Sequence, residues 1–289
     1  MFGSHLSISG GMHKAVNEAV RLGFNSVQVF TKNQQQWRVP PLPDEAIDAW
    51  RAACAAAKFS HVVSHDSYLI NLASPDPALR QKSIDLFEEE LRRCQALGIA
   101  YLVTHPGAHM GERDDPAAEL AGLDRIASAL AEVLSRNASG NTIVCLESTA
   151  GQGTSLGHRL EHLSHVLRQV KNPKRLGVCF DTAHLFAAGY DFRGRKYAGF
   201  IRDVDKHVSL ERVKVWHLND SKKPLGSRVD RHEHIGLGEI GDEGFRPIVR
   251  DKRWRDVPKI LETPKQLHTD GRDWDTHNLE RLTSMQRGR

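Results

Sequence analysis

The chain has 289 residues, of which 39% are hydrophobic and 26% are charged, and its formal net charge is +4. This length fits one α/β barrel or two smaller domains, and the sequence lacks an apolar run long enough to cross a membrane. The small positive charge allows nucleic acid as a partner without requiring it. The first residues lead into a strand pattern rather than a signal peptide, so we expect a cytoplasmic protein. No feature indicates an obligate protein partner, and we expect a monomer.

Cysteine and histidine usage points to different chemistry. The four cysteines stand singly within predicted helices or strands, at Cys54, Cys94, Cys145 and Cys179. The lack of a CxxC pair argues against a zinc knuckle or redox motif, and we expect these residues to be small buried hydrophobic groups. The sixteen histidines are more informative, because histidine is the commonest metal ligand in proteins.

Short apolar runs alternate with segments of helical periodicity along the whole sequence. Apolar residues at spacings of three and four predict helices over residues 77–97 and 117–135. Strands are predicted over residues 3–8, 26–30, 61–64, 101–104, 142–146, 177–180, 213–218 and 259–262. Eight strands, each followed by a helix, predict a parallel (β/α)₈ TIM barrel that forms a single domain over residues 1–289. The alternative is a doubly wound open sheet, but no GxGxxG motif follows the first strand.

Six consecutive predicted strands, from the third to the eighth, end in or next to a histidine, aspartate or glutamate. In a TIM barrel the carboxyl ends of the strands carry the chemistry, so these side chains should meet at one face. Carboxylates that gather there repel one another unless cations lie between them. The five imidazoles and four carboxylates are those of His65, His105, Glu147, Asp181, His184, His217, Asp230, His232 and Glu262.

These nine groups predict a metal centre. At three or four protein ligands per metal, they are enough for two or three ions with a position open to water. Histidine and carboxylate without thiolate suit Zn²⁺, with Mn²⁺ or Fe²⁺ possible at the more oxygen-rich position. In the DRHEH segment, spacing alone does not decide between His232 and His234 as the ligand.

The predicted ligands lie within longer motifs. These are HDSYLINL at residues 65–72, HPG at 105–107, ESTAGQG at 147–153, DTAHLFAAGYD at 181–191, HLNDSK and GSRVDRHEHIGLGEIG within 217–241, and LETP at 261–264. Taken together they resemble endonuclease IV, the family-2 apurinic/apyrimidinic endonuclease. The similarity extends from the FTKNQ segment at Phe30 to the final strand, although HPG or LETP alone would mean little.

The resemblance implies a TIM barrel with three zinc ions that cleaves duplex DNA 5′ to an abasic sugar and leaves a 3′-hydroxyl. It also implies a phosphodiesterase that trims 3′ ends. The family pattern selects His232 over His234. It implies three ligand sets: His65, His105 and Glu147; Glu147 as a bridge with Asp181, His217 and Glu262; and His184, Asp230 and His232.

Two carboxylates are the predicted catalytic residues. Metals bridged by Glu147 would share and ionise a water, because zinc can lower the pKa of bound water to about 7. Glu262, at a strand end beside the bridged pair, would orient or deprotonate this nucleophile.

Four further residues are predicted to contact DNA. Tyr68 and Leu69 follow His65 and match the family's loop, where groups must enter the duplex at the missing base. Arg231 is an expected phosphate contact. Gln35 stands where a relative carries arginine, so the part that it takes in damage recognition is open.

Two other functions fit parts of the pattern. A sugar isomerase or epimerase shares the barrel and the metal rim, but it needs one or two metals and gives no reason for Asp230 and His232. A DNA-damage binding protein without catalysis would bind abasic DNA and leave it uncut, and the full ligand set argues against it. Three ions per chain would favour the nuclease.

Overall fold

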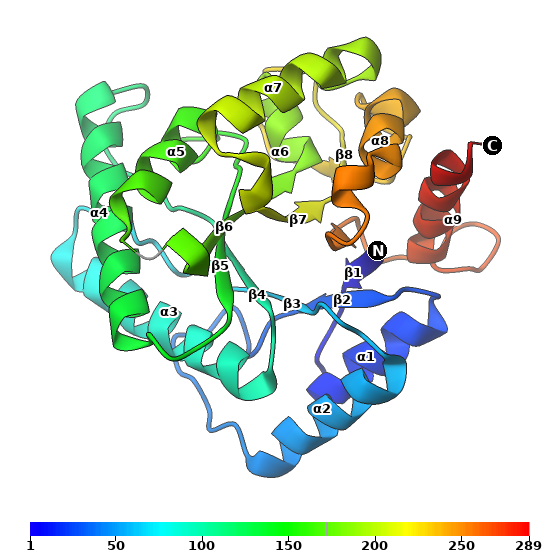
Figure 1. Ribbon diagram of the computed structural model, residues 1–289, viewed down its shortest axis with the longest axis horizontal. Coiled ribbons are helices and arrows are strands. Elements are labelled where there is room, and N and C mark those ends of the chain that lie inside the picture. The colour runs from blue at the N-terminus through cyan, green and yellow to red at the C-terminus, as the bar shows by residue number, and fades with distance from the viewer. Residues whose placement is uncertain (172, 289) are drawn as a thin grey trace.

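The structure is a computed structural model that describes residues 1–171 and 173–288. In this described part, eight parallel strands form a closed barrel with helices around its outside (Figure 1). Around the barrel the order is β1-β10-β7-β6-β5-β4-β3-β2, so neighbours in sequence are neighbours in space. The strands are β1 (Phe2–His5), β2 (Ser26–Val29), β3 (Val63–His65), β4 (Tyr101–Thr104), β5 (Ile143–Glu147), β6 (Leu176–Asp181), β7 (Val213–His217) and β10 (Lys259–Leu261). The predicted TIM barrel is confirmed.

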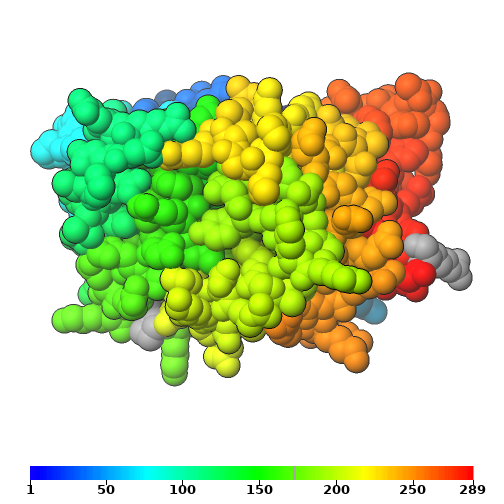
Figure 2. Space-filling view, turned by 90° about the horizontal axis from the view of Figure 1, so that it is seen from above, coloured from blue at the N-terminus to red at the C-terminus, as the bar shows by residue number. Residues whose placement is uncertain are grey.

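Helices follow the barrel strands and cover them. They are α1 (Met12–Arg21), α2 (Asp44–Ala57), α3 (Pro77–Leu97), α4 (Pro116–Arg136), α5 (Leu160–Gln169), α7 (Tyr197–His207), α8 (Gly241–Arg250) and α9 (Trp274–Arg287). Seen from above, they pass around the flank in sequence order, from the teal α4 to the red α9 (Figure 2). Two additions lie beyond the carboxyl ends of β6 and β7: the short helix α6 (Thr182–Ala187), and the antiparallel pair β8 (Asp220–Ser221) and β9 (His232–Glu233).

Element bounds agree with the predictions where local signals are strong. The helix predicted over residues 77–97 is α3, which begins because the Asp76 side chain accepts hydrogen bonds from the N–H groups of Ala78 and Leu79. It ends at Gly98, whose φ of 71° a residue with a side chain rarely adopts. The strand predicted over residues 3–8 stops at His5, which is three residues early.

Apolar residues form a buried layer inside the barrel. The layer consists of Val63, Val103, Cys145, Cys179, Val215 and Ile260, and each has no exposed surface. Packing there is tight, because a Cβ atom at Gly3 would lie 2.8 Å from Ile260 Cδ1. A larger apolar core lies between the strands and the surrounding helices.

The cysteines behave largely as expected. Cys94, Cys145 and Cys179 are buried and free. Cys54 on α2 is only half-buried, so the expectation of burial is wrong at this position. Among the described helices, none is both long and apolar enough to cross a membrane.

We predict that the interior layer contributes strongly to stability. Ile260→Ala should lower the free energy of unfolding by about 2–4 kcal/mol, because the barrel cannot collapse around the cavity left behind. Urea-induced unfolding at a fixed metal concentration measures this loss. Val20→Ala is the control, since Val20 is 52% exposed on α1 and should change stability by less than about 0.5 kcal/mol. An equal effect of both substitutions would contradict the prediction.

Candidate metal centre

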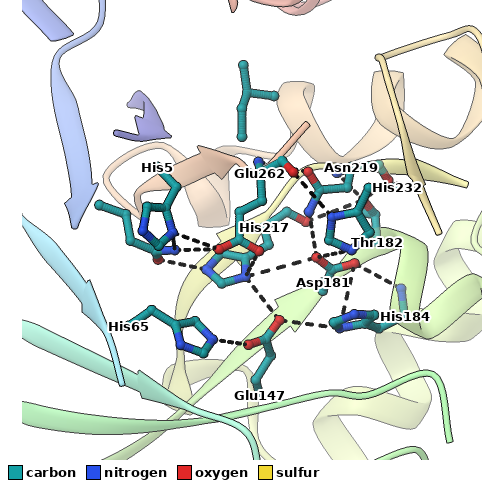
Figure 3. A network of polar contacts seen from close by, with 12 residues as sticks. His5, His65, Glu147, Asp181, Thr182, His184, His217, Asn219, His232 and Glu262 are labelled. Carbon is teal, nitrogen blue, oxygen red and sulfur yellow. Dashed lines mark hydrogen bonds and ion pairs between the residues drawn. The ribbon is translucent and has the colours of Figure 1, made fainter. Parts of the chain in front are cut away.

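Six of the predicted ligands project from barrel strands toward the barrel mouth. Residues two positions apart in a strand point to the same side, so a residue two positions after an interior residue also faces the interior. The pairs are Val63 and His65, Val103 and His105, Cys145 and Glu147, Cys179 and Asp181, Val215 and His217, and Ile260 and Glu262. A polar layer therefore follows the apolar layer along the strands. Figure 3 shows members of this polar layer, among them His65, Glu147 and His217, pointing toward one another.

The carboxylate of Glu147 lies at the centre of this polar layer and is fully buried. Its Oε2 is 3.1 Å from His65 Nε2 and 3.2 Å from His105 Nε2. Its Oε1 is 3.0 Å from His217 Nδ1 and 3.3 Å from His184 Nδ1. Each oxygen faces a different pair of imidazoles, which suits a carboxylate that bridges two cations.

The second predicted ligand set converges on one nitrogen of His217. This Nδ1 atom lies 3.0 Å from Glu147 Oε1 and 3.1 Å from Glu262 Oε2. Asp181 Oδ2 is 4.0 Å away on the neighbouring strand. Three carboxylates thus surround one imidazole, which makes this the most oxygen-rich part of the site.

The third predicted set combines α6, the loop that joins β8 to β9, and β9 itself. Asp230 Oδ2 lies 3.1 Å from His184 Nε2, and Asp230 Oδ1 lies 3.2 Å from His232 Nε2. His232 Nε2 is also 3.7 Å from Asp181 Oδ2, which connects this set to the second one. The His232 Nε2 atom is buried, and none of its contacts in the described part of the chain has hydrogen-bond geometry, the 3.2 Å approach to Asp230 included. A buried nitrogen without a partner fits a metal ligand.

The structure therefore brings all nine predicted residues together at one end of the barrel. Donor atoms of His65, His105 and Glu147 lie within 4.8 Å of one another, and so do those of Asp181, His184 and His232. That these side chains bind metal stays a prediction.

The charge balance of this centre is unusual. Within the described residues, the ion-pair partners of Glu147, Asp181, Asp230 and Glu262 are all histidines. Four buried or half-buried carboxylates without a lysine or arginine repel one another. Divalent cations among them would remove this repulsion, so the donor set fits metal ions.

Two other histidine–carboxylate clusters differ because each contains its own arginine. In the first, Glu119, His158 and His162 lie close together, but Arg159 pairs with Glu119 and its Nε donates to His162 Nε2 at 2.8 Å. A guanidinium already occupies the position that a metal would take. We therefore interpret this cluster as a structural ion network.

The second arginine-containing cluster lies before and within α9. It consists of His268, Asp270 and His277, and Arg272 Nε donates to Asp270 Oδ2 at 3.0 Å. The Arg272 Nη2 atom is also 3.3 Å from His277 Nδ1. The arginine neutralises the carboxylate, so this cluster has no need of a metal.

The carboxylates of the centre control the protonation of its imidazoles. Burial alone would lower the pKa of His232, but the charges of Asp181 and Asp230 raise this pKa to about 9. Burial likewise opposes the charged form of His184, yet Asp181, Asp230 and Glu147 raise its pKa well above the usual value. The surrounding carboxylates thus favour positive charge at the imidazoles of His232 and His184.

Backbone carbonyls orient two of the ligand imidazoles. His65 Nδ1–H donates to Asp66 O at 2.8 Å, and His184 Nδ1–H donates to Ser148 O at 2.9 Å. Because a carbonyl can only accept, Nδ1 carries a proton in each ring, and with a metal bound the Nε2 atom that faces the centre would be the unprotonated nitrogen. Such contacts fix the tautomer of a metal-binding histidine.

Sequence reasoning missed two residues that hold Glu262 and His217. Gln28 is fully buried, donates from Nε2 to Glu262 Oε1 at 2.6 Å, and accepts on Oε1 from His217 Nε2–H at 2.8 Å. His5 Nδ1 lies 3.2 Å from the same Glu262 oxygen. The signal for His5 is its place at the carboxyl end of β1. The strand predicted over residues 3–8 runs past this end and so places His5 in the middle of a strand. A glutamine inside the apolar run of β2 was the signal for Gln28.

Asn219, within the HLNDSK motif, holds Asp181 and the backbone of Glu262. Its Nδ2 donates to Asp181 Oδ2 at 2.6 Å, and its Oδ1 accepts from the backbone N–H of Glu262 at 2.8 Å. Asn219 follows His217 by two residues, so the same alternation that locates the ligands also identifies it.

The four predicted DNA contacts surround the mouth of the barrel. Tyr68 is 62% exposed, and its ring centre lies 5.5 Å from that of His65 and 6.1 Å from that of His105. Leu69 is half-buried, whereas Gln35 and Arg231 are exposed. All four lie in loops that follow the carboxyl ends of strands, as the prediction requires.

Asp220 explains the glycines of the GLGEIG motif. Its Oδ1 accepts from the backbone N–H groups of Ser221 and Ile240, at 2.8 and 2.9 Å, and its Oδ2 accepts from those of Gly236 and Gly241, at 2.9 and 3.2 Å. This carboxylate therefore anchors the loop after β9 instead of binding metal. A Cβ atom at residue 238 would lie 2.4 Å from Ser221 O, so only glycine fits there.

The fold and the site define a class of protein: a TIM barrel with a histidine–carboxylate cluster at its carboxyl end. The family model described as "Xylose isomerase-like TIM barrel" matches residues 16–284. The chain is 49% identical to "Probable endonuclease 4" of Chloroflexus aurantiacus, over 99% of this chain and 98% of that protein. It is 46% identical to "Probable endonuclease 4" of Trichlorobacter lovleyi, over 98% of both chains. The chain belongs to the endonuclease IV family, which confirms the resemblance seen in the sequence and makes the protein a nuclease-class enzyme.

Solved structures agree with this assignment. The crystal structure of endonuclease IV from Thermus thermophilus superposes with a TM-score of 0.85 at 35% identity, covering 100% of this chain and 99% of that one. A D-tagatose 3-epimerase-like protein superposes with a TM-score of 0.73 at 18% identity, covering 98% and 96%. The second likeness shows the shared barrel fold alone.

We predict that Asp220→Asn loosens the segment from Gly236 to Gly241. The amide has one acceptor oxygen in place of two, so two of the four backbone N–H groups lose their partner. Hydrogen exchange at Ile240 and Gly241 should become about 10- to 100-fold faster. Asp242→Asn, at a partly exposed carboxylate on α8, is the control and should leave these amides unchanged. Unchanged exchange in Asp220→Asn would show that the carboxylate does not anchor the loop.

Proposed function

We propose that this enzyme is a DNA-repair endonuclease that hydrolyses the phosphodiester 5′ to an abasic site in duplex DNA and leaves a 3′-hydroxyl. One observation carries the proposal: nine histidine and carboxylate ligands meet at the barrel mouth, and their carboxylates have no lysine or arginine partner among the described residues. The membership in the endonuclease IV family supports the same activity. Trimming of damaged 3′ ends would use the same site.

We infer three metal positions from the distances at the mouth. The first would be held by His65, His105 and Glu147, and the third by His184, Asp230 and His232, whose nitrogens each face a shared carboxylate. The second would be held by Glu147, Asp181, His217 and Glu262. Zn²⁺ suits all three, and Mn²⁺ or Fe²⁺ suits the second, because three of its four ligands are carboxylates.

The chain's own residues prepare the site for attack on phosphorus. When bound, divalent ions would supply Lewis acidity and a water of lowered pKa. Glu262 is held by Gln28 and His5 on one oxygen, while its other oxygen faces the centre. Burial would raise the pKa of Glu262, but His217 and His5 keep it well below the usual value. Glu262 is therefore an anion that accepts a hydrogen bond from the attacking water and sets its direction.

Tyr68 is the residue best placed to detect the missing base. Its exposed ring stands beside His65 and His105 at the edge of the proposed first metal position. With Leu69 it would enter the gap where stacking is broken. Arg231 would contact a phosphate, and Gln35 would approach the duplex from the loop after β2.

We further propose that residues 1–289 act as one domain and as a monomer. A cytoplasmic location, in contact with the nucleoid through DNA, suits this activity.

An epimerase is the weaker candidate, although several sugar epimerases share the fold. The epimerase and epimerase-like structures that superpose on this chain are at most 18% identical to it. They therefore show a shared barrel fold and nothing about function. A centre for one or two metals also does not need Asp230 and His232 as ligands. A count of three metal ions per chain would support the nuclease.

The purified enzyme loaded with zinc should nick a duplex that contains one tetrahydrofuran abasic analogue. The product should be extended by a DNA polymerase, which requires a 3′-hydroxyl. Treatment with a chelator should abolish the nick, and added Zn²⁺ should restore it, because the phosphodiester needs cationic charge for hydrolysis. A fully loaded enzyme that leaves this duplex intact would refute the proposed function.

Glu262→Gln should lower kcat for incision at least about 100-fold, because the amide cannot hold the attacking water as an anion does. Metal content per chain, measured by elemental analysis, should stay within one ion of the parent value. Glu239→Gln, at an exposed carboxylate in the loop after β9, is the control and should cut like the parent. If Glu262→Gln cuts at the parental rate, Glu262 does not direct the nucleophile.

A further inference from the structure

A buried ion pair lies beneath two of the loops that carry the proposed DNA contacts. Lys32 Nζ is 3.6 Å from Glu90 Oε1, and each side chain is 1% exposed. Glu90 lies on α3, and Lys32 lies in the loop between β2 and α2. A buried ion pair seldom stabilises a protein more than an apolar pair of the same size. Its role is more often to fix the positions of the groups around it.

Lys32 holds the part of its loop that presents Gln35. Its Nζ donates to the backbone oxygens of Asn33 at 3.0 Å and Gln36 at 2.6 Å, which lie on either side of this segment. The Asn33 side chain in turn accepts from the backbone N–H of Gln35 at 2.9 Å. The position of Gln35 therefore depends on where Lys32 is placed.

Glu90 holds the loop that presents Tyr68 and Leu69. The same Oε1 atom that faces Lys32 accepts from the backbone N–H of Ser67 at 3.3 Å. Ser67 Oγ then donates to Gln34 O at 2.6 Å, which joins this loop directly to the Lys32 loop. Both loops are thus tied to one carboxylate oxygen on α3.

A neighbouring arginine makes α3 a platform for the whole Lys32 loop. Arg93 lies one turn after Glu90, and its guanidinium donates to Thr31 O at 2.6 Å and to Pro40 O at 2.9 Å. These contacts fix both ends of the segment from residue 31 to residue 40. The Lys32–Glu90 pair fixes its middle, where it meets the Tyr68 loop.

We propose that the Lys32–Glu90 pair is a positioning device that sets the spacing between the Gln35 loop and the Tyr68 loop. This spacing selects duplexes with a missing base, because both loops must enter the distorted strand pair at once. The inference rests on the proposed function. Neither side chain contacts a proposed metal ligand in the described residues, so the pair controls selectivity without taking part in hydrolysis.

Glu90→Gln and Lys32→Met separate positioning from chemistry. Glutamine keeps an acceptor for the Ser67 N–H and removes the charge that holds Lys32. Each variant should raise KM for the abasic duplex about tenfold and reduce the preference for abasic over intact duplex by a similar factor. At saturating abasic duplex, kcat and metal content should stay within about twofold of the parent.

Two further variants distinguish a loss of loop positioning from a general loss of stability. The double variant Lys32→Met/Glu90→Gln leaves no unpaired buried charge, so its thermal stability should return toward the parent value while its selectivity stays low. Glu88→Gln is the matched control: it alters a buried carboxylate on the same helix, which contacts Arg92, Arg136 and Asn137 instead of a loop. Its KM and selectivity should equal those of the parent.

The outcomes distinguish the two proposals. A parent enzyme that does not cut abasic duplex refutes the proposed function itself. If the parent cuts and Glu90→Gln keeps the parental KM and selectivity, the positioning role is wrong. A fall in kcat together with loss of metal in the stable double variant would also overturn it, since the pair would then support the metal centre.

Discussion

Repulsion among four carboxylates at the barrel mouth is the constraint on which the rest of this structure depends. Glu147 and Asp181 have no exposed surface, and Glu262 is largely buried with them. The described residues place imidazoles and amides around these groups, but no lysine or arginine. In the two peripheral clusters, Arg159 and Arg272 take the central position. The mouth differs because, within the described residues, only imidazoles pair with its carboxylates, an arrangement that suits cations from outside the chain.

Strand alternation explains why so much of this centre can be predicted from the sequence. A strand that carries an interior valine, cysteine or isoleucine places the residue two positions later on the same side, one layer higher. His65, Glu147 and Asp181 follow this rule, as do the ligands on the other three strands. The rule needs only the strand positions, which apolar runs mark clearly. It also identifies Asn219.

The remainder of the site depends on contacts that periodicity does not describe. His184 lies on α6, Asp230 lies in the loop between β8 and β9, and His232 lies on β9, so alternation along the barrel strands does not place them. Gln28 is a different case, because its role arises from contacts with His217 and Glu262, which lie far away in the sequence. A prediction for such a residue requires the closed barrel, where β2 and β10 flank β1.

The proposed recognition loops around the mouth have a support that is separate from that of the predicted metal ligands. The predicted ligands stand mostly on strands, whose positions the barrel fixes. Gln35 and Tyr68 stand on loops whose relative position is set from below by α3, through Glu90 and Lys32. The proposed chemistry and the proposed recognition therefore rely on separate supports. A substitution beneath the loops would alter which DNA is bound while the predicted ligands keep their geometry, because the strands that carry them are held by the apolar layer of the barrel.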